Sequence, residues 1–122
     1  MTQTILIVDN QAFNVDLAKT ILKKGGFSVL SASSGLEAIA IIKKKRPDLV
    51  LMDVQLPGID GLETTKMIVS DPDVSETKVV AFSALAMPAD RKRALKAGCV
   101  GYITKPVGAR ELIEAVQSYL QD

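Results

Sequence analysis

Short apolar stretches alternate with longer segments of helical periodicity along the chain. The short stretches are rich in aliphatic and β-branched residues, as expected for strands buried on both faces. They cover residues 4–8, 28–32, 49–52, 79–82 and 100–103. Between them, apolar residues recur at four-residue steps, which predicts helices that turn one face to the core. The clearest stripes are Phe13, Leu17 and Ile21, and Leu112, Val116 and Leu120.

The strict alternation of strands and helices predicts a parallel sheet with helices on both faces. Each right-handed crossover between parallel strands needs a helix to return the chain. The predicted fold class is therefore α/β and doubly wound. Five strands favour the flavodoxin-like order 2-1-3-4-5, whose switch point lies between the carboxyl ends of strands 1 and 3.

Size and charge limit the possibilities further. The chain has 122 residues, of which 48% are hydrophobic. That suits a single domain over residues 1–122 with a core of its own, and we expect no output domain. A net charge of +1 favours neither nucleic acid nor a membrane surface as partner. No apolar run approaches the roughly 20 residues of a membrane span, so we expect a cytoplasmic protein.

Two residue types are informative by their scarcity. The chain contains no histidine, which excludes Ser-His-Asp and Cys-His nucleophilic sites, imidazole zinc sites and a phosphohistidine of its own. The single cysteine, Cys99, excludes an internal disulfide and predicts a buried thiol. Neither a P-loop nor a GxGxxG motif is present to bind a nucleotide. Any phosphoryl group must therefore come from another molecule.

Polar residues follow the predicted strands at their carboxyl ends. They are Asp9 and Asn10 after the first strand, Asp53 after the third, Ser83 after the fourth and Lys105 after the fifth. In a doubly wound sheet these ends share one edge, so we expect a lysine beside two carboxylates. Asp53 is then a candidate covalent acceptor for a phosphoryl group. Taken alone, Asp9 is equally compatible with a helix cap, and Lys105 with a loop charge.

Four motifs give the chain a family resemblance. ILIVDN, PDLVLMDVQLPGIDGLE, VVAFSALAM and AGCVGYITKPV together resemble the receiver domains of bacterial response regulators, the CheY-like superfamily. The resemblance runs from Thr4 to the last predicted helix. It is closest to stand-alone receivers of the cell-division-regulator kind and to receivers appended to hybrid kinases.

The resemblance implies a role for each of four residues. Asp53 would be the phosphoacceptor, and Lys105 would ion-pair with the phosphoryl group. Ser83 would be the hydroxyl switch that moves toward the phosphate, and Tyr102 the aromatic switch that rotates in behind it. The family also implies a cis peptide bond between Lys105 and Pro106.

A magnesium site is implied at the same edge. Its ligands would be Asp9, Asn10, Asp53 and the backbone carbonyl of Gln55. Asn10 departs from the family pattern, which has an acid at this position. An amide oxygen can bind Mg²⁺ but brings no charge, so we expect weak magnesium binding.

Two functions fit these residues. The first is a phosphorylation-dependent switch of a two-component phosphorelay, a signalling phosphoprotein rather than an enzyme. Its partners would be a histidine kinase or histidine phosphotransfer protein and a downstream protein bound through the helix 4, strand 5 and helix 5 face. The second is a pseudo-receiver, an interaction module with little or no magnesium-dependent phosphorylation because of Asn10. A flavodoxin-like cofactor carrier is disfavoured, because aromatic residues make up only 4% of the chain and tryptophan is absent.

The predicted fourth helix carries a basic stretch. Its residues are Arg91, Lys92, Arg93 and Lys96. They are compatible with an ordinary solvated helix surface and also with electrostatic guidance of an acidic partner. Direct DNA binding is disfavoured, because no recognition-helix motif accompanies them.

Overall fold

The computed structural model describes residues 2–121, which form one five-stranded parallel sheet and five helices. The strands are β1 (Thr4–Val8), β2 (Ser28–Ala32), β3 (Leu49–Met52), β4 (Val79–Ser83) and β5 (Gly101–Thr104). The helices are α1 (Ala12–Lys24), α2 (Gly35–Lys45), α3 (Gly61–Ser70), α4 (Pro88–Ala97) and α5 (Ala109–Leu120).

The predicted fold class is confirmed. The strand order is β2-β1-β3-β4-β5, and all four strand pairs are parallel. The first three strands have the predicted bounds, whereas β4 extends to Ser83 and β5 begins one residue later than predicted. Ser83 belongs to β4 because it pairs with Thr104, and its carbonyl accepts the N–H of Lys105 at 2.8 Å.

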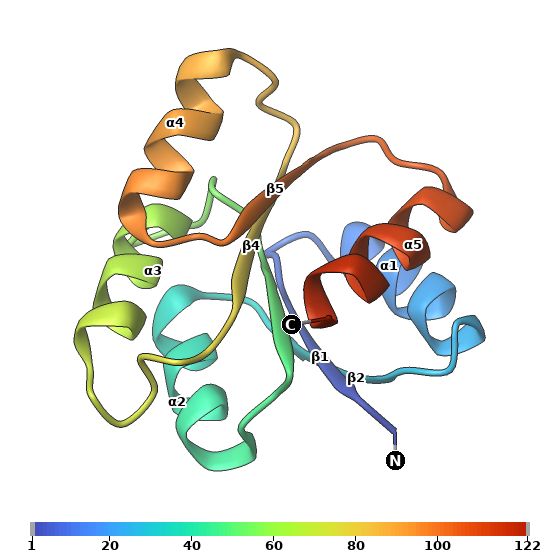
Figure 1. Cartoon of the computed structure of the whole chain (residues 1–122), viewed down its shortest axis with the longest axis horizontal. Coiled ribbons are helices and arrows are strands. Elements are labelled where there is room, and N and C mark those ends of the chain that lie inside the picture. The colour runs from blue at the N-terminus through green and yellow to red at the C-terminus, as the bar shows by residue number, and fades with distance from the viewer. Residues whose placement is uncertain (1, 122) are drawn as a thin grey trace.

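Helices cover both faces of the sheet (Figure 1). Helices α1 and α5 lie on one face, and α2, α3 and α4 lie on the other. Strand alternation divides the buried side chains between two cores. Ile5, Ile7, Leu51, Phe82 and Ile103 face α1 and α5, together with Leu112 and Val116 of α5. Leu6, Val8, Met52, Ala81 and Tyr102 face the other three helices.

The α5 stripe is confirmed at Leu112 and Val116, which are buried. The α1 stripe is wrong at Phe13 and Leu17, which are 75% and 52% exposed, whereas Ile21 is partly buried and packs against the core. The residues of α1 that are buried are Ala18 and Leu22. A helix can turn only one stripe onto a sheet, and the small side chain of Ala18 permits close approach there.

Two further expectations concern Cys99 and the membrane. Cys99 is a buried free thiol, as predicted, and burial raises its pKa, with Thr65 Oγ1 at 3.8 Å from its sulfur. Within residues 2–121, no helix is long and apolar enough to cross a bilayer.

The two stripes of α1 differ in what they contribute to stability. Phe13→Ser and Leu17→Ser should each change the free energy of unfolding by no more than about 0.5 kcal/mol, as is usual for surface positions. Leu22→Ala, on the buried stripe, should cost about 2–5 kcal/mol by leaving a cavity. Urea denaturation of the three variants measures this difference. A cost for Phe13→Ser similar to that of Leu22→Ala would contradict the assignment.

Candidate functional site

The parallel register places Asp9 and Asp53 side by side. Val8 is paired with Met52 at the ends of β1 and β3, so the residue that follows each strand reaches the same edge of the sheet. The ladder continues one step beyond, because the Asp53 N–H donates to the Val8 carbonyl at 2.9 Å. The Asp9 N–H similarly donates to the Ala32 carbonyl at 3.0 Å. Both carboxylates are therefore held by a rigid backbone.

Lys105 reaches these carboxylates from the end of β5. Its Nζ lies 2.7 Å from Asp9 Oδ2 and 3.8 Å from Asp53 Oδ2. The Lys105–Pro106 bond is cis, as the resemblance implied. The lysine therefore lies beside two acids, and its closer partner is Asp9 rather than Asp53.

The three charged groups are largely withdrawn from water. The side chains of Asp9, Asp53 and Lys105 are 4%, 13% and 17% exposed. Burial raises the pKa of Asp53 above its ordinary value, and the Asp9 charge acts in the same direction. The Lys105 ammonium and the Gln55 N–H oppose that rise without cancelling it. One lysine thus neutralises two acids only in part.

Ser83 and Tyr102 meet at a residue that the sequence did not single out. Ser83 is fully buried, and its Oγ accepts the Leu85 N–H at 3.2 Å. Tyr102 is buried, and its hydroxyl donates to the Leu85 carbonyl at 2.7 Å. The guanidinium of Arg91 on α4 lies 5.9 Å from the centre of the Tyr102 ring. Leu85 therefore connects the end of β4 to β5, and Tyr102 connects β5 to α4.

The expected metal ligands supply only oxygen atoms, the donors that a hard cation such as Mg²⁺ prefers. Asp9 and Asn10 border one hollow together with Asp16 and Glu37. The Gln55 N–H donates to Asp53 Oδ1 at 3.2 Å, which fixes the loop that carries its carbonyl. Over residues 2–121, no three Asp, Glu, His or Cys side chains gather closely enough to hold a metal ion. These donors fit magnesium, with the carboxylates of Asp9 and Asp53 and the neutral amide of Asn10 where the family pattern has a third acid.

Asp9 already has partners for both of its oxygens. Oδ1 accepts the Gln11 N–H at 2.9 Å, and Oδ2 accepts the Lys105 ammonium. Asp9 is therefore not the N-cap of α1, a position that Gln11 occupies. A cation at Asp9 would compete with Lys105 for the same carboxylate.

Close packing against Gly61 fixes the backbone at Asp53. A Cβ at Gly61 would lie 2.1 Å from the Asp53 carbonyl oxygen, so only glycine allows α3 to begin this close to the site. The Gly61 N–H donates to the Val54 carbonyl at 2.9 Å. Asp60 caps α3 by accepting the Glu63 N–H. The loop after Asp53 is held at both ends.

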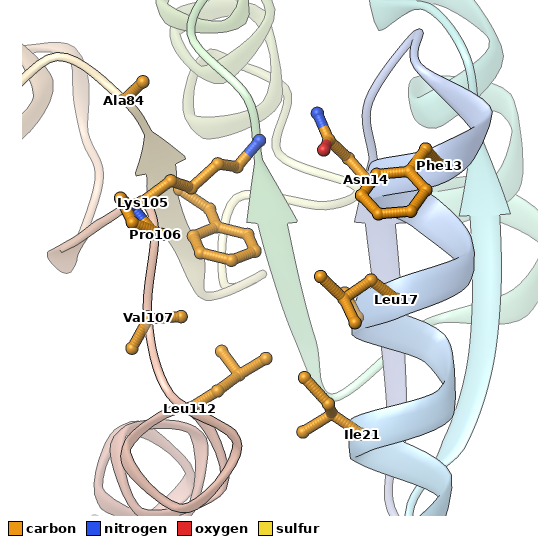
Figure 2. A pocket seen from close by; sticks show the side chains of 11 residues that line it. Phe13, Asn14, Leu17, Ile21, Ala84, Lys105, Pro106, Val107 and Leu112 are labelled. Atoms are coloured by element: carbon orange, nitrogen blue, oxygen red, sulfur yellow. The ribbon is translucent and has the colours of Figure 1, made fainter.

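An apolar groove of about 370 Å³ begins at the site and runs between α1 and α5 (Figure 2). Phe13, Leu17 and Ile21 line one wall, and Lys105, Pro106, Val107 and Leu112 line the other. This is where the exposed stripe of α1 lies.

Phe82 also lines the groove, and its ring centre lies 4.9 Å from Lys105 Nζ. From the sequence pattern, Phe82 is predicted only to be an apolar residue of its strand. Its position beside Lys105 could have been predicted from strand alternation, which places Phe82 on the same face as Ile103 and Lys105.

Comparison with known proteins identifies close relatives. The family model described as "Response regulator receiver domain" matches residues 5–117. The polar-differentiation response regulator DivK of Brucella ovis is 38% identical over 122 residues, which cover 100% of this chain and 99% of that protein.

Solved structures agree in fold. A putative response regulator from Chloroflexus aurantiacus J-10-fl has a TM-score of 0.93 at 31% identity, with 98% of each chain covered. The receiver domain of the sensor histidine kinase PA1611 from Pseudomonas aeruginosa PAO1 has a TM-score of 0.90 at 29% identity, also with 98% of each covered. That structure has a magnesium ion coordinated in its active site cleft.

The raised pKa of Asp53 predicts a pH dependence of stability in metal-free buffer. Between the unfolded value near 3.8 and the higher folded value, the folded chain binds more protons than the unfolded chain. This group therefore makes stability fall as pH rises through that window. Asp53→Asn removes the effect and should be more stable than wild type at neutral pH.

Urea denaturation from pH 3.5 to 7 with a chelator present measures the difference between the two proteins. Glu114→Gln, which removes an exposed acid of α5 outside the site, is the matched control. A difference between wild type and Asp53→Asn that stays constant with pH would contradict the assignment.

Proposed function

The chain belongs to the response regulator receiver domain family, and on that premise we propose that it is a phosphorylation-dependent signalling switch in a two-component phosphorelay. Asp53 would accept the phosphoryl group. The observation that carries the proposal is the position of Lys105, whose ammonium lies within 4 Å of both Asp9 and Asp53 at the edge of the sheet.

The proposed reaction is transfer from a phosphohistidine of a partner. A carboxylate oxygen of Asp53 forms a bond to phosphorus while the phosphorus–nitrogen bond breaks, and the imidazole keeps the electron pair and takes up a proton. The incoming group carries negative charge toward two acids, so the barrier depends on a fixed positive charge nearby. Lys105 supplies that charge from a site that excludes most water, where its effect is strongest.

Magnesium would be held by Asp9, Asn10, Asp53 and the Gln55 carbonyl. When bound, it would neutralise charge on the phosphoryl oxygens. We propose that its affinity is low, because Asn10 contributes no charge and because Lys105 already occupies Asp9. The magnesium ion in the PA1611 receiver supports a metal at the corresponding cleft.

Phosphorylation would act on the surface through Leu85. A phosphoryl group carries about two negative charges and three acceptor oxygens, so it would draw the Ser83 hydroxyl away from the Leu85 N–H. Leu85 would then keep its hydrogen bond to the Tyr102 hydroxyl. A shift of Leu85 and Tyr102 would change the position of Arg91 and with it the surface of α4.

The proposed partners are proteins. A histidine kinase or histidine phosphotransfer protein would donate the phosphoryl group, and a downstream protein would bind the α4, β5 and α5 face. The cations of α4 favour an acidic partner, although Arg93 is already paired with Asp90. We propose neither a nucleic acid nor a membrane as partner, and we place the switch in the cytoplasm. The chain would act as a signalling protein that assists only its own phosphorylation and dephosphorylation.

The pseudo-receiver is the second candidate. It is favoured by the close pair between Lys105 and Asp9, which leaves the site partly neutral without a metal. In that case the chain would bind its partners through the same face without accepting a phosphoryl group.

Intact mass spectrometry distinguishes the two candidates. Incubation with acetyl phosphate and magnesium should add the mass of one phosphoryl group to the wild type and none to Asp53→Asn. Asp71→Asn, which removes an acid outside the site, should still be labelled. Wild type that stays unlabelled at high magnesium concentration would overturn the switch and favour the pseudo-receiver.

The charge at position 10 should control magnesium affinity. Asn10→Asp adds a carboxylate next to Asp9, and at an effective dielectric constant of about 20 the added attraction corresponds to roughly a hundredfold tighter binding. Calorimetric titration with magnesium measures this. Gln117→Glu, which adds the same charge on the exposed face of α5, controls for overall charge and should change little. Equal affinities of wild type and Asn10→Asp would contradict the argument.

A further inference from the structure

Lys105 is in contact with an aromatic ring as well as with two acids. Its ammonium lies 4.9 Å from the centre of the Phe82 ring. We infer that Phe82 is a positioning residue for Lys105, holding the ammonium over the Asp53 site through a cation–π interaction. This inference rests on the proposed phosphoacceptor function, because it assigns a residue that prepares Lys105 for that reaction.

The sheet itself brings the two side chains together. Phe82 is paired with Ile103 and Ser83 with Thr104 in the β4–β5 register. The Lys105 N–H then donates to the Ser83 carbonyl at 2.8 Å, which extends the ladder by one residue. Because side chains alternate along a strand, Phe82, Ile103 and Lys105 emerge on the same face. The lysine side chain therefore leaves the backbone next to the ring.

The surroundings of the ammonium strengthen the interaction. The face of an aromatic ring is negative, and a cation gains most from it when both are removed from water. Phe82 is 8% exposed, and the Lys105 side chain is 17% exposed. Asp9 is hydrogen-bonded to the ammonium at 2.7 Å, and Asp53 lies at 3.8 Å. The ring thus provides a third favourable neighbour where water would otherwise be needed.

The ring also limits where the lysine can go. Phe82 and Lys105 both line the groove between α1 and α5. A lysine has four rotatable bonds, and ordering it costs up to about 2 kcal/mol of conformational free energy. An aliphatic residue at position 82 could fill the core but would not attract the ammonium. The ring therefore adds to the preference of Lys105 for its position beside the two acids.

Fluorinated phenylalanines at position 82 separate this role from core packing. Ring fluorination weakens the negative face stepwise while the size of the side chain changes little. The rate of phosphorylation by acetyl phosphate and the affinity for beryllofluoride, a phosphoryl mimic, should both fall stepwise from phenylalanine to trifluorophenylalanine. Phe82→Leu should lose about two- to thirtyfold in both, the range that a cation–π contact corresponds to. Phe82→Tyr, which keeps a ring face, should retain most of the wild-type rate.

A double-mutant cycle tests the contact without any phosphoryl group. The cycle comprises wild type, Phe82→Leu, Lys105→Met and the double variant, compared by urea denaturation. Favourable coupling between the two positions is the expected result. If wild type is phosphorylated but the fluorinated series is flat and the coupling is absent, the role of Phe82 is overturned while the proposed function stands. If wild type takes up no phosphoryl group, the proposed function fails and the positioning role with it, whatever the coupling.

Discussion

The site depends on the parallel register of β1 and β3, which forces two carboxylates into adjacent positions at the edge of the sheet. Val8 lies opposite Met52, so Asp9 and Asp53 have no freedom to separate. Two anions this close, both largely buried, require a cation. Lys105 provides it from the end of β5, two strands away from β3. The loop geometry around Asp53, the packing of Gly61 and the contacts of Lys105 all preserve this arrangement of charge.

Much of this arrangement was predictable because it follows from backbone periodicity. Buried parallel strands appear as apolar runs, and three of the five had the predicted bounds. Because the carboxyl ends of such strands share one edge of the sheet, Asp9, Asp53 and Lys105 were predicted to lie close together. The cis bond at Pro106 was inferred from the resemblance alone. Each of these conclusions needs only the type and order of residues.

The remaining features depend on side-chain packing, which the pattern alone does not determine. Phe13, Leu17 and Ile21 form an apolar stripe, but only Ile21 packs against the core, and the buried side chains of α1 are Ala18 and Leu22. Phe13 and Leu17 were therefore wrongly predicted to face the core. In the sequence, Phe82 is one more apolar residue of a strand, and only the folded structure places Lys105 over its ring. The sequence also does not predict that Lys105 lies closer to Asp9 than to Asp53, since both acids follow strands that end at the same edge of the sheet.

Leu85 illustrates how a connection can be built without relying on the identity of a residue. Ser83 and Tyr102 are both bonded to its main-chain atoms, the first to its N–H and the second to its carbonyl. The side chain at this position takes no part in either bond. A substitution there can therefore change the neighbouring surface while both hydrogen bonds are kept. Proline is the exception, because it has no N–H to donate to Ser83.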